Sequence, residues 1–194
     1  MPKFEEIFRK TNENEKKIVK NSLYNISNKI WEYILEEKYE IYIKISESKQ
    51  NKTSFELFLI PQQLESEINK IKNLTPINFA GIPLGFIKNK RLFLSLETAE
   101  LLFNLHKIDP RIILILNENG EKSVLYGNPI KKSMILEISS EIQANRIIFL
   151  INKNQEFLGL GLLKVNYEKY KKLKNNDNLA LNLVDKGSYL RRDQ

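Results

Sequence analysis

The sequence of 194 residues contains no cysteine and a single histidine, His106. Disulfides, thiol nucleophiles and cysteine-ligated zinc sites are therefore excluded, as are Cys-His pairs and histidine-rich zinc sites. His106 comes after an expected helix beside a short linker, where we interpret it as a surface or interface residue rather than a catalytic base. The absence of cysteine agrees with a reducing compartment but does not require one.

Long hydrophobic runs are also missing. The longest, residues 112–116 and 147–151, have the length of strands, whereas a helix that spans a bilayer needs about 20 apolar residues. The first residues are charged and lack the apolar stretch of a signal peptide. We therefore expect a soluble cytoplasmic protein, nucleolar if the source is eukaryotic, with no membrane partner.

Acidic residues are fewer than basic ones, 24 against 31, which gives a formal net charge of +7. The excess is uneven, because residues 111–194 carry +5 and residues 1–110 carry +2. A basic domain attracts polyanions through counterion release, and nucleic acid is the commonest polyanion of the cytosol. Solubility charge on a lysine-rich protein is the competing interpretation, and charge alone does not decide between them.

The most informative feature that is present is a repeat. Residues 111–121 (RIILILNENGE) and 146–156 (RIIFLINKNQE) are identical at six of eleven positions. Each copy is an apolar run followed by an Asn-x-Asn turn and a second run, and Asn119-Gly120 is a strong turn signal. Each copy therefore predicts a β-hairpin, and two hairpins close most economically into a small barrel. Chance similarity between the copies would leave this prediction unchanged.

The first half mixes helix and strand patterns. Apolar spacing from Ile18 to Ile34, after a helix start at Thr11, predicts one long helix. The next patterns predict a hairpin at 39–45 and 55–60, a helix after Pro61, strands at 79–87 and 92–96, and a helix at 97–105.

Pro110 disfavours helix before it, and a strand pattern begins just after it, so we place a domain boundary here. Beyond the two hairpins come a lysine-rich stretch at 167–174 and a last extended segment at 179–185. The predicted fold class is α+β, with an N-terminal α/β domain that has a mainly antiparallel sheet (residues 1–108), followed by a small β-barrel domain (residues 109–194).

No catalytic or cofactor motif emerges. The segment Gly120-Glu121-Lys122-Ser123 lacks the glycine before the lysine and the following helix that a phosphate loop needs, since both flanks are expected to be strands. Gly159-Leu160-Gly161 lacks the third glycine of a dinucleotide fingerprint and lies in an expected strand, where it permits a bend or a close backbone approach. We expect no enzymatic activity, no cofactor and no metal.

Four segments of the second half occur in a distinctive order: 125–128 (LYGN), 132–133 (KS), 157–161 (FLGLG) and 185–191 (DKGSYLR). Upstream of them lie Thr11, 81–86 (GIPLGF), 91–94 (RLFL) and 98–99 (TA). In order and spacing these segments resemble the Nip-seven family, archaeal and eukaryotic factors of large ribosomal subunit assembly. The resemblance covers nearly the whole chain and suggests the archaeal homologue.

The resemblance implies a pre-PUA domain followed by a PUA-type β pseudobarrel that binds RNA without catalysis. The implied partners are pre-ribosomal RNA, uridine-rich or structured, and ribosome assembly or exosome-associated proteins. We expect a monomer. One position departs from the family pattern, because Met134 occupies the place of a glycine after the Lys-Ser pair. A side chain there would block close approach of the backbone to RNA.

The candidate RNA-binding residues are basic and lie near expected strand ends: Lys131, Lys132, Lys164, Lys186, Arg191 and Arg192. If the barrel closes, its last strand lies near the 127–129 turn and makes one basic edge. Because guanidinium groups suit phosphate, we expect Arg191 and Arg192 to contact RNA and, as exposed charges, to add little to folding. In the first half, Trp31, Tyr39 and Tyr42 are candidate anchors for a partner protein.

Two alternatives remain open at this point. PUA domains often accompany RNA-modifying enzymes, so the chain could be such an enzyme or its accessory subunit, although the first half has no recognisable cofactor motif. The second alternative is a protein adaptor that has lost RNA affinity, which Met134 keeps open.

Overall fold

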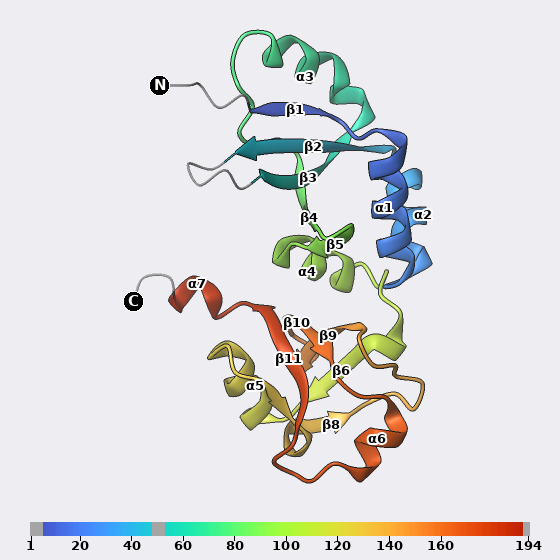
Figure 1. The fold of residues 1–194 in the computed structure, drawn as a ribbon, viewed down its shortest axis with the longest axis vertical. Helices are drawn as coiled ribbons and strands as arrows, with labels where there is room; N and C mark the ends of the chain where they lie inside the picture. The colour runs from blue at the N-terminus through green and yellow to red at the C-terminus, as the bar shows by residue number, and fades with distance from the viewer. Residues whose placement is uncertain (1–5, 48–52, 192–194) are drawn as a thin grey trace. The chain divides into compact units, whose positions relative to one another are not determined.

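The structure is a computed structural model that describes residues 6–47 and 53–191 (Figure 1). The chain divides into two compact units, Met1–Thr98 and Ala99–Gln194. The division falls inside helix α4 (Leu96–Asn104), ten residues before the predicted boundary between residues 108 and 109. Each unit is built on a sheet of its own.

Unit 1 is an antiparallel sheet with helices. In chain order its elements are β1 (Ile7–Lys10), α1 (Glu13–Tyr24), α2 (Asn28–Glu36), β2 (Tyr39–Glu47), β3 (Thr53–Pro61), the 3₁₀ turn η1 (Gln62–Leu64), α3 (Glu65–Lys72), β4 (Ile82–Lys88), β5 (Arg91–Leu94) and the start of α4. The sheet order is β1-β2-β3-β4-β5, and every neighbouring pair is antiparallel. The predicted hairpin and the predicted strand pair are therefore confirmed.

The predicted long first helix is wrong, because the chain forms two helices. Asn12 rather than Thr11 caps α1, accepting the Glu15 N–H at 2.9 Å, and the Glu15 carboxylate accepts the Asn12 N–H at 2.8 Å. Ser27 then adopts extended backbone and begins α2. Asn and Ser favour such caps over helix interiors because their side chains compete for backbone hydrogen bonds.

The sheet of unit 1 is buried on both faces. Tyr42, Phe58 and Ile60 pack against Ile68 of α3, whereas the alternate residues of β2 and β3 face the other side and are also buried. Tyr42 is 2% exposed, and Trp31 of α2 is 6% exposed. The expectation that these two rings anchor a partner is therefore wrong, because both belong to the core.

Unit 2 is a barrel-like sheet with short helices. After α4 its elements are η2 (Pro110–Ile112), β6 (Ile113–Leu116), α5 (Glu118–Leu125), β7 (Ile130–Lys131), η3 (Lys132–Met134), β8 (Ile135–Glu137), β9 (Ile147–Asn152), β10 (Phe157–Leu163), α6 (Tyr167–Lys172), β11 (Asn178–Asp185) and α7 (Ser188–Arg191). The sheet order is β7-β11-β10-β9-β6-β8, in which β6 and β9 are parallel. The predicted α+β class with a small barrel in the second half is confirmed.

The two repeat copies form the neighbouring parallel strands β6 and β9, but the chain continues differently after each of them. After β9 it makes the predicted hairpin with β10. After β6 the predicted hairpin is wrong, because Asn117 accepts the Gly120 N–H at 3.0 Å and caps helix α5. Asn152 instead accepts the N–H groups of Asn154 and Glu156, each at 3.0 Å, which closes a turn.

The glycines of β10 permit the close backbone approach that the sequence predicts. A Cβ atom on Gly159 would collide with the Val184 carbonyl oxygen, and one on Gly161 would lie 3.0 Å from the Leu181 carbonyl oxygen. The pairing of β10 with β11 shifts register between Leu160 and Gly161. The barrel bends here.

Candidate nucleic-acid interface

Two of the predicted cations lie on either side of the last strand. Lys131 of β7 pairs with Asn178 at the start of β11. On the other side of β11, Lys164 follows the end of β10, and its N–H donates to the Leu179 carbonyl at 2.9 Å. Because neighbouring strands lie about 4.8 Å apart, the two lysine backbones are separated by roughly 10 Å. Their chain neighbours Ile130 and Leu163 are buried, so both lysine side chains leave the core. Neither ammonium makes an ion pair or hydrogen bond with a residue that the structure describes.

Lys132 is held by helix α6. Its ammonium donates to the carbonyls of Lys171 at 3.0 Å and Leu173 at 2.7 Å, and it lies 5.3 Å from the centre of the Tyr170 ring. A cation is favourable at these carbonyls, which have no partner within the helix. Lys132 therefore positions η3 against α6, and one of its three N–H donors has no partner among the described residues.

Arg191 clamps the end of the barrel. Its guanidinium donates to both carboxylate oxygens of Asp185, at 3.1 and 2.9 Å, and to the Leu125 carbonyl. The hydrogen bond with Asp185 raises the pKa of Arg191. Gly127 and Gly187 leave space for this contact, since a Cβ on Gly127 would lie 3.0 Å from the guanidinium and one on Gly187 would lie 2.8 Å from it. The last strand does lie beside the 127–129 turn, as predicted, but the expectation that Arg191 is an exposed charge with little part in folding is wrong, because its guanidinium binds the buried carboxylate of Asp185.

The remaining predicted residues add little to this surface. The Lys186 ammonium is paired with the Glu100 carboxylate of α4 at 2.5 Å, so its charge is already neutralised within unit 2. Arg192 lies outside the described residues. The structure therefore brings Lys131, Lys132 and Lys164 together at the start of β11, a group we name the basic edge, and places Arg191 at the opposite end of that strand.

Two exposed residues of α5 and its C-terminal end were not identified from the sequence as candidate site residues. Tyr126 ends helix α5 with its side chain 73% exposed, and its N–H donates to the Lys122 carbonyl at 3.0 Å. Lys122 is exposed one helical turn earlier. A helix prediction for residues 118–125 would have placed them side by side.

Met134 does not obstruct the surface. Its side chain packs against the core of unit 2, and its sulfur accepts the Lys131 N–H at 3.4 Å. Its carbonyl accepts the Asn117 N–H at 2.9 Å. The side chain therefore points toward the core rather than over the surface, and its effect on RNA binding stays a prediction.

Residues 6–47 and 53–191 hold no group of three or more His, Asp or Glu side chains that could bind a metal. His106 is exposed, with a left-handed backbone at the end of α4. A helix does follow Gly120, contrary to the expected strand, but the glycine that a phosphate loop needs before the lysine is still missing. No helix within the described part of the chain is long and apolar enough to cross a membrane.

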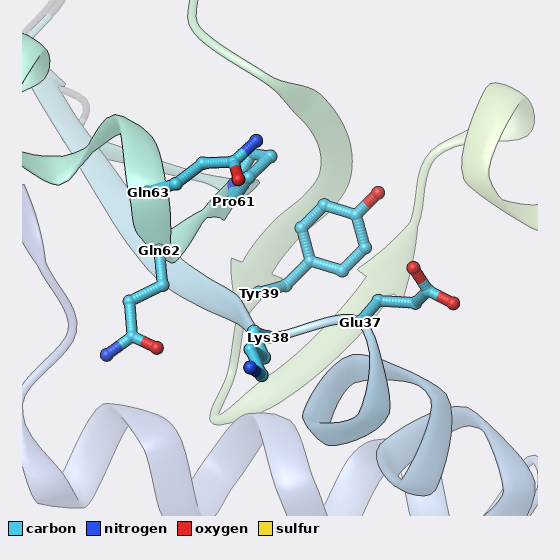
Figure 2. A pocket seen from close by; sticks show the side chains of 6 residues that line it. All are labelled: Glu37, Lys38, Tyr39, Pro61, Gln62 and Gln63. Atoms are coloured by element: carbon cyan, nitrogen blue, oxygen red, sulfur yellow. The ribbon is translucent and has the colours of Figure 1, made fainter.

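A separate hollow of about 630 Å³ lies in unit 1, where α2 meets β2 and β3 ends (Figure 2). Its lining residues are Glu37, Lys38, Tyr39, Pro61, Gln62 and Gln63. Tyr39 supplies the single aromatic ring of this set, and the charges of Glu37 and Lys38 oppose each other. The hollow has no net positive charge to attract a polyanion.

Comparison with known proteins assigns the family. A family model described as the UPF0113 PUA domain matches residues 112–194. The UPF0113 protein of Archaeoglobus fulgidus is 34% identical over 125 residues, which cover 64% of this chain and 67% of that protein. The chain belongs to the UPF0113 family. The barrel of this UPF0113 protein is thus a PUA domain, as the sequence predicts.

Solved structures share the fold across both units. A hypothetical protein of Pyrococcus horikoshii has a TM-score of 0.63 at 16% identity, over 92% of this chain and 94% of that one. A PUA domain protein of Aeropyrum pernix, solved as a tartrate complex, has a TM-score of 0.66 at 10% identity, over 96% and 90%. A conserved PUA domain protein of Thermoplasma acidophilum has a TM-score of 0.53 at 15% identity, over 96% and 99%. At these identities the likeness establishes the fold of this UPF0113 protein and nothing further.

Proposed function

We propose that this UPF0113 protein binds structured RNA through its PUA domain and acts, without catalysing a reaction, in assembly of the large ribosomal subunit. The observation that carries the proposal is the basic edge on a domain of the PUA family. Lys131 and Lys164 are unpaired within the described chain and lie roughly 10 Å apart on a rigid sheet. Structured RNA is held largely through phosphate and 2′-hydroxyl contacts, for which such cations suffice.

The role in ribosome assembly rests on the similarity to the Nip-seven family, which extends from the PUA domain into unit 1. On this proposal the partners are pre-ribosomal RNA and assembly or exosome-associated proteins, and the protein works as a cytoplasmic monomer, or in the nucleolus if its source is eukaryotic. The inward orientation of Met134 supports RNA binding over a pure adaptor role.

Fluorescence anisotropy with labelled ribosomal RNA fragments, measured from low to moderate salt, tests the proposal. The wild-type chain should bind, with affinity falling as salt rises. The double variant K131A/K164A should bind more weakly and flatten the slope of log K against log salt by roughly 1.4 to 1.8, since each phosphate contact contributes ~0.7 to 0.9.

A matched control removes two exposed lysines from helices of unit 1, in the variant K17A/K29A. It has the same change in net charge and should keep the wild-type slope. No RNA binding by the wild type, or an equal loss in both variants, would contradict the proposal. Nucleoside analysis of RNA incubated with the protein and S-adenosylmethionine tests the non-catalytic role, and any modified nucleoside would overturn it.

A further inference from the structure

Tyr126 presents its ring to solvent at one end of the PUA domain. The residue is 73% exposed, more than Phe79 at 64% or Tyr24 at 49%. An exposed tyrosine ring presents a flat π-face on which a nucleobase can stack.

The backbone under the ring is firmly held. Tyr126 and Gly127 donate their N–H groups to the carbonyls of Lys122 and Val124, at 3.0 and 2.8 Å. The Val124 carbonyl also accepts from the Asn182 side chain of β11 at 2.8 Å. Gly127 has a φ of +77°, which a residue with a side chain rarely adopts, and its missing Cβ admits the guanidinium of Arg191. The turn is thus fixed, whereas the ring is largely exposed.

Two cationic residues lie close to Tyr126 along the chain or through its neighbours. Lys122 precedes Tyr126 by one helical turn, and its ammonium makes no ion pair or hydrogen bond within residues 6–47 and 53–191. The Arg191 guanidinium binds the carbonyl of Leu125, the residue before Tyr126, and uses three of its five N–H donors on Asp185 and Leu125, so two donors have no partner among the described residues. An exposed aromatic ring on a turn that also carries such cations fits a nucleotide, whose base stacks while its phosphate accepts hydrogen bonds.

The position of the ring agrees with a path along the last strand. Lys131 of the basic edge follows Tyr126 by five residues, so at most about 17 Å of chain separates them. Antiparallel pairing of β7 with β11 places the basic edge at the start of β11, and the Arg191 clamp lies at its end. A single strand of RNA that follows β11 could therefore contact the lysines and the ring together.

We infer that Tyr126 is a stacking platform for one unpaired nucleobase, with Lys122 and Arg191 for the adjoining phosphate. This inference rests on the proposed RNA binding and adds to it a preference for single-stranded over fully paired RNA. Stacking on a tyrosine face accepts any base, because every base has a π-face. The site thus selects for exposure of the base rather than for its identity.

The experiment compares two probes, a fluorescein-labelled oligouridine of about fifteen nucleotides and an RNA duplex of the same length. The full-length variant Y126A should lose about 5- to 150-fold in affinity for the single strand, the range measured for loss of one base–aromatic stack. Its affinity for the duplex should be unchanged. The slope of log K against log salt should also be unchanged, because the tyrosine releases no counterion.

Y126F keeps the ring and should bind the single strand within about 2-fold of wild type. Y126L keeps an apolar side chain without a π-face and should behave like Y126A. Circular dichroism checks that each variant is folded. Wild-type affinity in Y126A, or an equal loss for both probes, would overturn the stacking site while leaving RNA binding intact. If the wild type binds neither probe, the proposed function itself fails.

Discussion

Asp185 of β11 holds the guanidinium of Arg191, which also binds the Leu125 carbonyl at the end of α5. It is 2% exposed and receives the guanidinium of Arg191 at 2.9 Å and the Asn182 amide at 3.0 Å. A buried carboxylate is stable only when its oxygens accept such hydrogen bonds. The segment DKGSYLR therefore owes its pattern to closure of the barrel as much as to any ligand.

Replacement of this carboxylate should destabilise the protein. In Asp185→Asn an amide replaces a charged acceptor, and one N–H faces the guanidinium, so we expect a loss of about 1–3 kcal/mol in the free energy of unfolding. Urea denaturation measures the loss. The control Glu168→Gln removes an acid that is 71% exposed in its ion pair with Lys171 and should leave the urea midpoint unchanged. Equal midpoints for the two variants would contradict the clamp.

At the scale of the element, the start of α1 shows how one side chain serves two purposes. Glu15 completes the capping box with Asn12, and its carboxylate accepts hydrogen bonds from both terminal nitrogens of Arg9, each at 2.8 Å. The hydrogen bond from Arg9 is the main cause that lowers the pKa of Glu15 below its ordinary value of 4.5. The folded protein therefore binds a proton at Glu15 less readily than the unfolded chain does.

A dependence on pH results from this difference. The stability that Glu15 contributes is fully present above pH 4.5 and is lost as the pH falls through the lower pKa of the folded state. Glu15→Gln should therefore lower the urea midpoint at pH 7, and its difference from wild type should shrink at pH 3 to 4. Glu13→Gln, exposed in the same helical turn, is the control. A difference that stays constant with pH would rule out the ion pair as its cause.

Most elements were predictable because their patterns are local. The strands of unit 1 alternate, and each pairs with the next in the chain. The failure at residues 117–125 has a physical reason, since an Asn after an apolar strand suits both a helix cap and a turn. Asn117 is followed by Glu118 and Glu121, which favour a helix start, whereas Asn152 is followed by the glycine-rich β10.

The candidate site was predicted only in part, because the sequence analysis missed the helix at residues 118–125. The hairpin predicted for the first repeat copy has its second strand at residues 123–126, which would separate Lys122 from Tyr126 by about 13 Å, whereas the helix brings their Cβ atoms to about 6 Å. The roles of Lys132 and Arg191 depend on tertiary partners, the α6 carbonyls and Asp185, which no local pattern reveals. Lys131 and Lys164 were found because they sit at strand ends, and their role in binding stays a prediction.

At the scale of the whole molecule, net charge does not separate the two units. Divided after Thr98, unit 1 has 16 basic and 13 acidic side chains, giving +3, and unit 2 has 15 and 11, giving +4. The difference in net charge between residues 1–110 and 111–194 therefore depends on where the sequence is divided. The PUA family match is the property that sets unit 2 apart.

Crosslinking of the full chain tests this division of labour. RNA that contains 4-thiouridine, irradiated in complex with the protein and mapped by mass spectrometry, should mark peptides between residues 117 and 191. Tyr126 and the basic edge lie in this range. Crosslinks confined to residues 1–98 would place the RNA on unit 1 and contradict both proposals.

The strand orders of the two sheets have a consequence for synthesis on the ribosome. In unit 1 each strand pairs with the one made just before it, so the sheet can grow as the chain emerges. In unit 2 the last strand, β11, lies between β7 and β10. Until Asn178–Asp185 has left the exit tunnel, both of those strands have open edges on which another chain can pair. We therefore expect a nascent chain stalled in this interval to aggregate more readily than the folded protein and to need a chaperone that shields these edges.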